Sequence, residues 1–118
     1  MHFKIVTIFP KELSNSLSYG VVGNAINDNK IRIDYFDPRN HADNKHGSID
    51  DKPYGGGPGM VMQAKPVLES IAQARDNSLD VPVYFLSPRG KTFNQNKAKE
   101  LSKMDKIVLV SSRYEGLD

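Results

Sequence analysis

Two apolar runs in the second half of the chain constrain its fold more than any other feature. Residues 81–86 (VPVYFL) and 106–110 (KIVLV) are nearly continuous in hydrophobic side chains. Such runs are typical of strands that are buried on both faces of a parallel sheet. Between them, residues 94–103 have the thin apolar face of a surface helix. The order strand, helix, strand predicts an α/β fold with a mostly parallel sheet and flanking helices.

The first half of the chain has the same alternation. Residues 3–9 are rich in β-branched and aromatic side chains and stop at Pro10, so they predict a first strand. Residues 31–36 alternate apolar and polar positions and predict a second strand. Apolar residues also recur at helical spacing over 13–22, where glycines at 20 and 23 divide the pattern into two short pieces. Two further helices are expected, a weak one over 24–29 and an amphipathic one over 66–74.

The composition narrows the class of protein. The 118 residues carry 16 Lys and Arg against 14 Asp and Glu, which excludes both a polybasic tail and an acidic solvating chain. The absence of cysteine excludes a disulfide scaffold and a thiol nucleophile. No apolar run reaches about 18 residues, and the N-terminus does not resemble a signal peptide. We therefore expect a cytoplasmic protein that has no contact with a membrane.

Glycine-containing loops follow the two apolar strands, at 86–90 (LSPRG) and 112–116 (SRYEG). In open α/β sheets, ligands bind outside the carboxyl ends of the strands. If the two strands are neighbours, these loops can hold a flat heterocycle between backbone segments, because glycine permits close approach. On composition alone, ordinary turns into the following segments are the favoured interpretation.

Residues 37–59 lack hydrophobic periodicity and predict a long loop, which in a compact domain is usually functional or disordered. Within it, the run PYGGGPGM over 53–60 matches neither a phosphate loop nor a dinucleotide fingerprint. The interleaved prolines make a flexible linker a weaker alternative to a binding surface. Arg39, Lys45 and Lys52 suit contacts with RNA phosphates and polar base edges, although on these residues alone a plain solvated loop is almost as good an interpretation. His41 and His46 match no metal-binding spacing, so we expect no metal site there.

In this order the motifs resemble the amino-terminal half of the bacterial tRNA (guanine-N1)-methyltransferases, a SPOUT-type family. The resemblance covers the whole chain, and its most specific parts are the blocks 50–62 and 113–118. The matching stretches are IVTIFP at 5–10, YG at 19–20, PRN at 38–40, KH at 45–46, DDKPYGGGPGMVM at 50–62, LSP at 86–88 and RYEGLD at 113–118.

The resemblance implies transfer of a methyl group from S-adenosylmethionine to N1 of the guanine next to the anticodon of tRNA. It implies a trefoil-knot methyltransferase fold and a homodimer whose active site lies at the subunit interface. Residues 1–118 would form the S-adenosylmethionine-binding domain, incomplete at its C-terminal end. The knot, the catalytic base and a helical C-terminal domain would lie beyond Asp118, so we expect the isolated chain to be inactive.

The resemblance also assigns site residues. The cofactor-binding residues would be Phe85, Leu86, Ser87, Pro88, Ser112, Tyr114, Glu115 and Gly116. The substrate side would comprise Gly55, Gly56, Gly57, Pro58 and Gly59, with Arg39, Lys45 and Lys52 as tRNA contacts. Glu115 would have a supporting electrostatic role, and a divalent ion such as magnesium would be an optional further cofactor. The family has Cys-Gly where this chain has Ser111-Ser112, which places a Cβ and a hydroxyl against the cofactor.

Two other functions remain open at this point. The chain could be an RNA-binding module that has lost catalysis but uses the same loops. It could also be a nucleotide-binding domain of unrelated activity, in which the glycine run holds phosphates. The absence of a phosphate-loop lysine argues against the second alternative.

Overall fold

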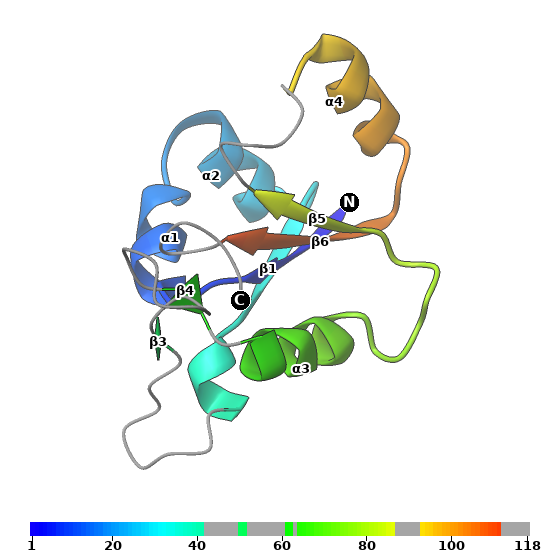
Figure 1. Ribbon diagram of the computed structural model, residues 1–118. Coiled ribbons are helices and arrows are strands. Elements are labelled where there is room, and N and C mark those ends of the chain that lie inside the picture. The colour runs from blue at the N-terminus through cyan, green and yellow to red at the C-terminus, as the bar shows by residue number, and fades with distance from the viewer. Residues whose placement is uncertain (42–49, 52–60, 63, 87–92, 112–118) are drawn as a thin grey trace.

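The computed structural model describes residues 1–41, 50–51, 61–62, 64–86 and 93–111. A four-stranded, wholly parallel sheet forms its centre, with the strand order β2-β1-β6-β5. Helices lie on both faces, which gives three layers (Figure 1). The expected α/β class and parallel sheet are therefore confirmed. The central strands are β1 (His2–Val6) and β6 (Lys106–Ser111), and the edge strands are β2 (Arg32–Phe36) and β5 (Val83–Leu86).

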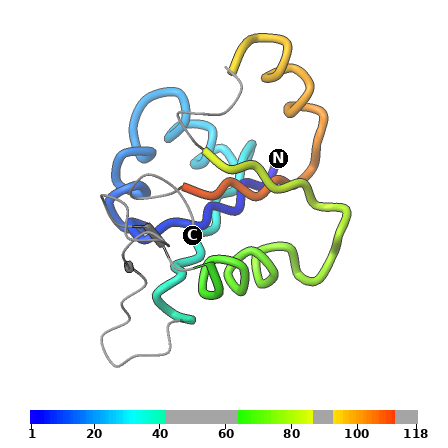
Figure 2. The backbone as a smooth tube through the Cα atoms, viewed as in Figure 1, coloured from blue at the N-terminus to red at the C-terminus, as the bar shows by residue number. Residues whose placement is uncertain are grey.

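The connections between strands explain the strand order. After β1 come the helices α1 (Pro10–Ser16) and α2 (Gly20–Asn27), and the chain returns to β2 beside β1. From β2 it passes through a 3₁₀ turn, η1 (Pro38–His41), and α3 (Ala64–Ala74) to reach β5 at the opposite edge. Figure 2 allows this crossing to be followed along the backbone. The helix α4 (Gln95–Ser102) then leads into β6, which lies between β5 and β1.

The hydrophobic core lies between the sheet and α3. The strands contribute Val6, Val108 and Val110, all at most 1% exposed, and α3 contributes Val67 and Ala74. These strand residues occupy one face because side chains alternate along a strand and the register pairs Val6 with Val110. The amphipathic helix expected over 66–74 is thus confirmed as the principal cover of this face.

The opposite face of the sheet is covered by α1, α2 and α4 (Figure 1). Tyr84 of β5 points to this side, where the Lys97 ammonium of α4 lies 5.1 Å from the centre of its ring. The N-cap of α4 is Asn94, whose side chain accepts a hydrogen bond from the Lys97 amide at 2.9 Å. This capping bond explains why the helix begins at residue 95.

Several expected boundaries were wrong. The first strand ends at Val6 rather than Phe9, and Pro10 begins a helix, a position that tolerates proline because the N–H is free there anyway. Gly23 does not break the helical pattern but lies within α2. A Cβ at Gly23 would lie 2.3 Å from the Ser18 carbonyl oxygen, so the glycine permits a close approach. Residues 37–59 are not wholly a loop, since they contain η1 and the short strand β3 (Asp50–Asp51).

The strand β5 is also less buried than its apolar sequence predicts. It occupies a sheet edge, and its last two side chains, Phe85 and Leu86, are 52% and 53% exposed. By contrast β6, with a similar composition, has Ile107, Val108 and Val110 buried. No helix in the described part of the chain is long and apolar enough to cross a membrane.

Candidate functional site at the carboxyl edge of the sheet

The carboxyl ends of β5 and β6 lie side by side. The two strands are parallel neighbours, and Leu86 pairs in register with Ser111, the last residue of β6. The segments that follow, 87–92 and 112–118, therefore leave the sheet from adjacent positions on the same edge. The juxtaposition expected for the two glycine-containing loops is confirmed at their points of departure. Ser87, Pro88, Ser112, Tyr114, Glu115 and Gly116 lie outside the described residues.

Phe85 and Leu86 provide an apolar surface at this edge. Adjacent residues of a strand point to opposite faces, so Phe85 shares the face of Val110 and Leu86 that of Ser111. Both side chains are about half exposed, although complete burial of such a side chain would contribute about 1.5–3 kcal/mol. Exposed apolar side chains at the end of a strand fit a flat, partly apolar ligand that is held against the sheet edge.

The end of β1 lies at the centre of the same edge. The Thr7 amide donates to the Phe36 carbonyl oxygen at 3.0 Å, which continues the β1–β2 pairing past Val6. The Thr7 hydroxyl oxygen accepts a hydrogen bond from the Phe9 amide, also at 3.0 Å. This bond turns the chain into α1 and leaves the Phe9 side chain 45% exposed. Nothing in the sequence pattern separates Thr7 or Phe9 from the strand expected over residues 3–9.

Arg39 lies just beyond the carboxyl end of β2, on η1. Its guanidinium forms a two-armed ion pair with Asp37, with Nη2 to Oδ2 at 2.7 Å and Nε to Oδ1 at 3.1 Å. The Arg39 amide also donates to Asp37 Oδ1 at 2.9 Å. The Arg39 side chain remains 50% exposed. Arg39 is therefore held at the carboxyl edge of the sheet, whereas Lys45 and Lys52 lie outside the described residues.

Two short paired strands flank the glycine-rich run in the sequence. β3 (Asp50–Asp51) and β4 (Val61–Met62) are antiparallel, with Asp50 opposite Met62 and Asp51 opposite Val61. The points where residues 52–60 begin and end are therefore adjacent. Figure 1 places β3 and β4 on the side toward which β5 and β6 point, so this run starts and finishes near the carboxyl edge. Gly55, Gly56, Gly57, Pro58 and Gly59 themselves lie outside the described residues.

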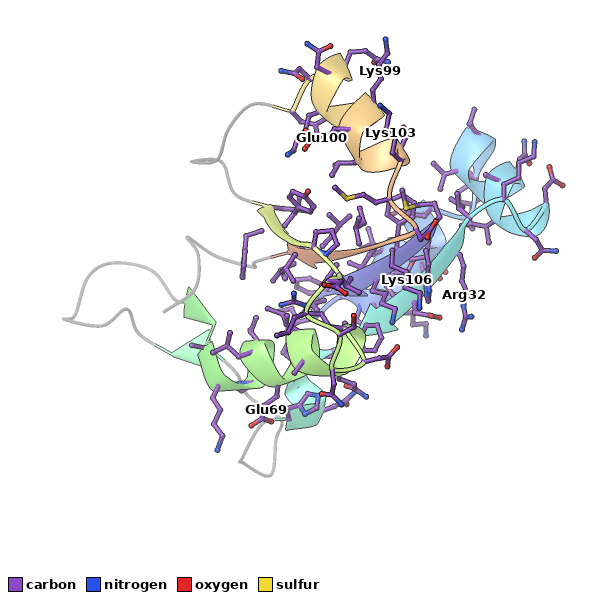
Figure 3. The ribbon with its side chains drawn as sticks, turned by 90° about the vertical axis from the view of Figure 1, so that its right-hand side faces the viewer. Arg32, Glu69, Lys99, Glu100, Lys103 and Lys106 are labelled. Atoms are coloured by element: carbon purple, nitrogen blue, oxygen red, sulfur yellow. The ribbon has the colours of Figure 1, made fainter. Side chains whose placement is uncertain are left out.

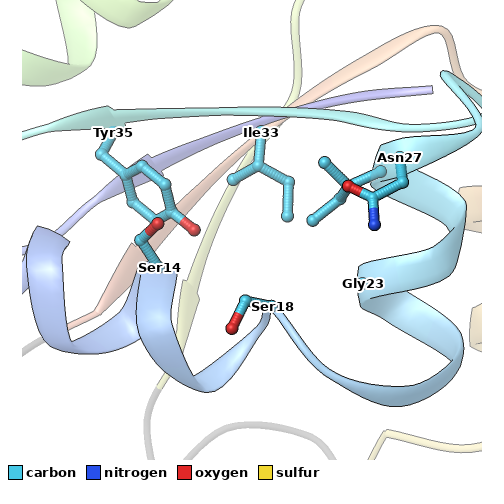
Figure 4. A pocket seen from close by; sticks show the side chains of 7 residues that line it. Ser14, Ser18, Gly23, Asn27, Ile33 and Tyr35 are labelled. Atoms are coloured by element: carbon cyan, nitrogen blue, oxygen red, sulfur yellow. The ribbon is translucent and has the colours of Figure 1, made fainter.

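A separate cavity lies away from this edge, between α1, α2 and β2 (Figure 4). Its volume is about 170 Å³, and its lining includes Ser14, Ser18, Ile33 and Tyr35. None of the expected site residues lines it. Within the described ranges, no three His, Cys, Asp or Glu side chains are grouped so that they could hold a metal ion.

Comparison with known proteins identifies the relatives of the chain. A family model described as tRNA (Guanine-1)-methyltransferase TrmD matches residues 1–118. The chain is 49% identical over 116 residues to a tRNA (guanine-N(1)-)-methyltransferase of Buchnera aphidicola subsp. Schizaphis graminum, covering 98% of this chain and 44% of that protein. It is 41% identical over 118 residues to the protein of that name in Caldanaerobacter subterraneus subsp. tengcongensis, covering 100% of this chain and 48% of the relative.

A solved structure shows the same arrangement. The crystal structure of the tRNA (m1G37) methyltransferase from Aquifex aeolicus superposes with a TM-score of 0.87 at 37% identity. The match covers 100% of this chain and 53% of the Aquifex chain. The present chain thus spans about half the length of the relatives it matches.

Proposed function

The chain belongs to the tRNA (guanine-1)-methyltransferase family, and we propose that the complete product of its gene methylates N1 of the guanine next to the anticodon of tRNA. The observation that carries this proposal is the family match over all 118 residues. The adjacent carboxyl ends of β5 and β6 support it, because both candidate cofactor loops start there. Residues 1–118 would form the S-adenosylmethionine-binding part of that enzyme.

The described residues at the edge fit the proposed cofactor. Leu86 offers a half-exposed apolar side chain on the face of the sheet that it shares with Ser111, where it would contact a flat adenine ring. Phe85 offers a half-exposed apolar side chain on the opposite face. Ser87, Pro88, Ser112, Tyr114, Glu115 and Gly116 would complete the cofactor site through the two loops that leave from these strands. S-adenosylmethionine would supply an electrophilic methyl group on its sulfonium sulfur.

The proposed methyl transfer requires the protein to remove a proton from guanine N1 and to align the two reactants. A C–N bond forms at guanine N1 as the S–C bond breaks, and the N1 proton must leave because neutral guanine is a poor nucleophile at that nitrogen. A carboxylate is suited to accept the proton as general base. We assign Glu115 a supporting electrostatic role beside the guanine ring of the substrate. The role of general base, which accepts the N1 proton, is left to a residue outside this chain. Alignment of the two reactants by the edge loops would provide much of the rate acceleration.

The substrate side would be formed by the glycine-rich run, with Arg39, Lys45 and Lys52 toward the tRNA backbone. Arg39 supports this part of the proposal, since Asp37 holds it at the carboxyl edge with half of its side chain exposed. Arginine suits phosphate contacts because its planar fork can donate two parallel hydrogen bonds. A homodimer with the site at its interface, a knotted chain, a cytoplasmic location and an optional divalent ion such as magnesium belong to the same proposal.

Binding of the cofactor separates this function from its rival, an RNA-binding module without catalysis. In thermal unfolding of the complete protein, S-adenosylmethionine at 100 times its Kd should add about 2.7 kcal/mol to the free energy of unfolding. ATP at the same concentration serves as the control, because a phosphate-binding domain would respond to it instead. No shift with S-adenosylmethionine would favour the RNA-binding module.

A further inference from the structure

His41 joins the turn that carries Arg39 to the helix α3. Its Nε2 atom lies 3.1 Å from Gln73 Oε1, and its Nδ1 atom lies 3.4 Å from Glu69 Oε2. Each ring nitrogen therefore faces an oxygen of a different α3 side chain. Figure 3 shows Glu69 on the part of α3 that lies against η1. The His41 side chain is only 25% exposed, so the ring is packed into this contact rather than projecting into solvent.

The turn depends on such contacts for its position. η1 spans only Pro38–His41, and a short 3₁₀ segment has little stability of its own. Two local bonds fix its internal shape, from the Arg39 amide to Asp37 Oδ1 and from the Asn40 amide to the Asp37 carbonyl oxygen. Neither bond ties the turn to the rest of the molecule. His41, at the end of the turn, contacts α3, and Pro38, at its beginning, is buried.

We propose that His41 is a positioning residue, which holds the η1 turn against α3 so that Arg39 is presented at a fixed place to the RNA. His41 and Arg39 are two residues apart on one turn, and the guanidinium is already bound by Asp37. A rotation of the turn would therefore move Arg39 and Asp37 together. This inference rests on the proposed function, because it takes Arg39 as a contact to the tRNA.

A double-mutant cycle in the complete protein tests the inference. The measured quantity is the Kd for a tRNA transcript with guanine next to the anticodon, for wild type, His41→Phe, Arg39→Ala and the double variant. Phenylalanine keeps the size of the ring but removes both polar contacts. His41→Phe should raise this Kd about three- to tenfold, equivalent to about 0.6–1.4 kcal/mol. In the Arg39→Ala background the same substitution should have no further effect, since coupled sites are not additive.

Two further variants exclude a merely structural effect. His41→Gln keeps a donor near Gln73 and should recover part of the affinity, whereas Gln73→Ala should weaken tRNA binding with Arg39 intact. Ala72→Ser, at an exposed position of α3, is the control and should bind tRNA as wild type does. The Kd for S-adenosylmethionine should stay within a factor of two in every variant. A general loss of structure would change both affinities.

The possible outcomes distinguish the positioning role of His41 from the proposed methyltransferase function. Equal effects of His41→Phe in the two backgrounds would overturn the positioning role while leaving Arg39 as an RNA contact. If Arg39→Ala leaves the tRNA Kd and its dependence on salt unchanged, the Arg39 contact and the His41 inference both fail. Failure of the wild-type protein to methylate the transcript, with the cycle behaving as expected, would overturn the proposed reaction alone.

Discussion

The Lys4 ammonium donates a hydrogen bond of 2.9 Å to Asp76 Oδ2, although the two residues are 72 positions apart in the chain. Lys4 lies in the central strand β1 with a side chain only 5% exposed, whereas Asp76, after the end of α3, is 75% exposed. Asp76 has a φ of 50°, in the left-handed region. The pair thus connects the buried ammonium of a central strand, β1, to the turn that leads from α3 toward β5.

Removal of the Asp76 carboxylate should lower the free energy of unfolding more than removal of the Lys4 ammonium. Asp76→Ala leaves a buried ammonium without its charged partner, while Lys4→Met removes the charge and leaves Asp76 in water. We expect Asp76→Ala to lower the urea midpoint of unfolding more than Lys4→Met. The double variant should be more stable than Asp76→Ala alone. A midpoint for Asp76→Ala equal to that of wild type would show that the ion pair contributes nothing.

The same pair predicts a dependence of stability on pH. The hydrogen bond and the charge of Lys4 hold the pKa of Asp76 below its ordinary value. A carboxyl group with a lower pKa in the folded state stabilises the protein above its unfolded pKa, about 4, and loses this contribution as the pH falls through the folded value. Asp76→Asn should therefore be less stable than wild type at pH 6, and the difference should shrink at pH 3. Glu12→Gln, at an exposed position of α1, is the control. A difference that is the same at both pH values would contradict this account.

The close approach of Gly23 to the Ser18 backbone predicts that substitution of this glycine lowers the stability of the protein. Gly23→Ala places a Cβ 2.3 Å from the Ser18 carbonyl oxygen, so the backbone must move apart. Overpacking of this kind costs about 1–3 kcal/mol. Val21→Ala in the same helix, where the side chain is 86% exposed, should change the stability by less than about 0.5 kcal/mol. Chemical denaturation of both variants measures this contrast, and equal effects would show that the helix relaxes freely around Gly23.

Because the end of β5 is exposed, a substitution there should weaken S-adenosylmethionine binding without lowering the stability of the protein. Leu86→Ser should weaken S-adenosylmethionine binding about tenfold, equivalent to 1.4 kcal/mol, because the side chain contacts the ligand in our proposal. The stability of the free protein should change little, because this side chain is 53% exposed. Phe93→Ser, at a 66% exposed position outside the proposed site, is the matched control. Isothermal titration gives both Kd values, and equal Kd values for Leu86→Ser and wild type would remove Leu86 from the site.

The sequence predicts the regular parts of this fold well because they follow from local periodicity. The apolar run of β6, the apolar face of α3 and the start of α4 at Asn94 all involve neighbouring residues. The position of β5 at a sheet edge does not follow from its sequence, since its composition matches that of the buried β6. Lys4–Asp76 and His41–Gln73 join residues 72 and 32 positions apart, and no local pattern indicates such pairs.

In the candidate site too, local sequence patterns predict some features and not others. Parallel strands at 81–86 and 106–110 predict loops that leave from one edge, and the pairing of Leu86 with Ser111 confirms their adjacency. The η1 turn could not be predicted, because Pro38, Arg39 and His41 acquire their arrangement from Asp37 and α3. The roles of the residues within the loops came from the family resemblance rather than from physical reasoning on the sequence.

Methyl transfer to a defined RNA is the direct test of the proposed activity. The complete gene product is incubated with S-adenosylmethionine carrying a labelled methyl group and a tRNA transcript with guanine next to the anticodon. A transcript with adenine at that position is the control, and nucleoside analysis identifies the product. We expect labelled 1-methylguanosine from the first transcript and no label in the second. Absence of 1-methylguanosine, from protein that binds both S-adenosylmethionine and the transcript, would contradict it.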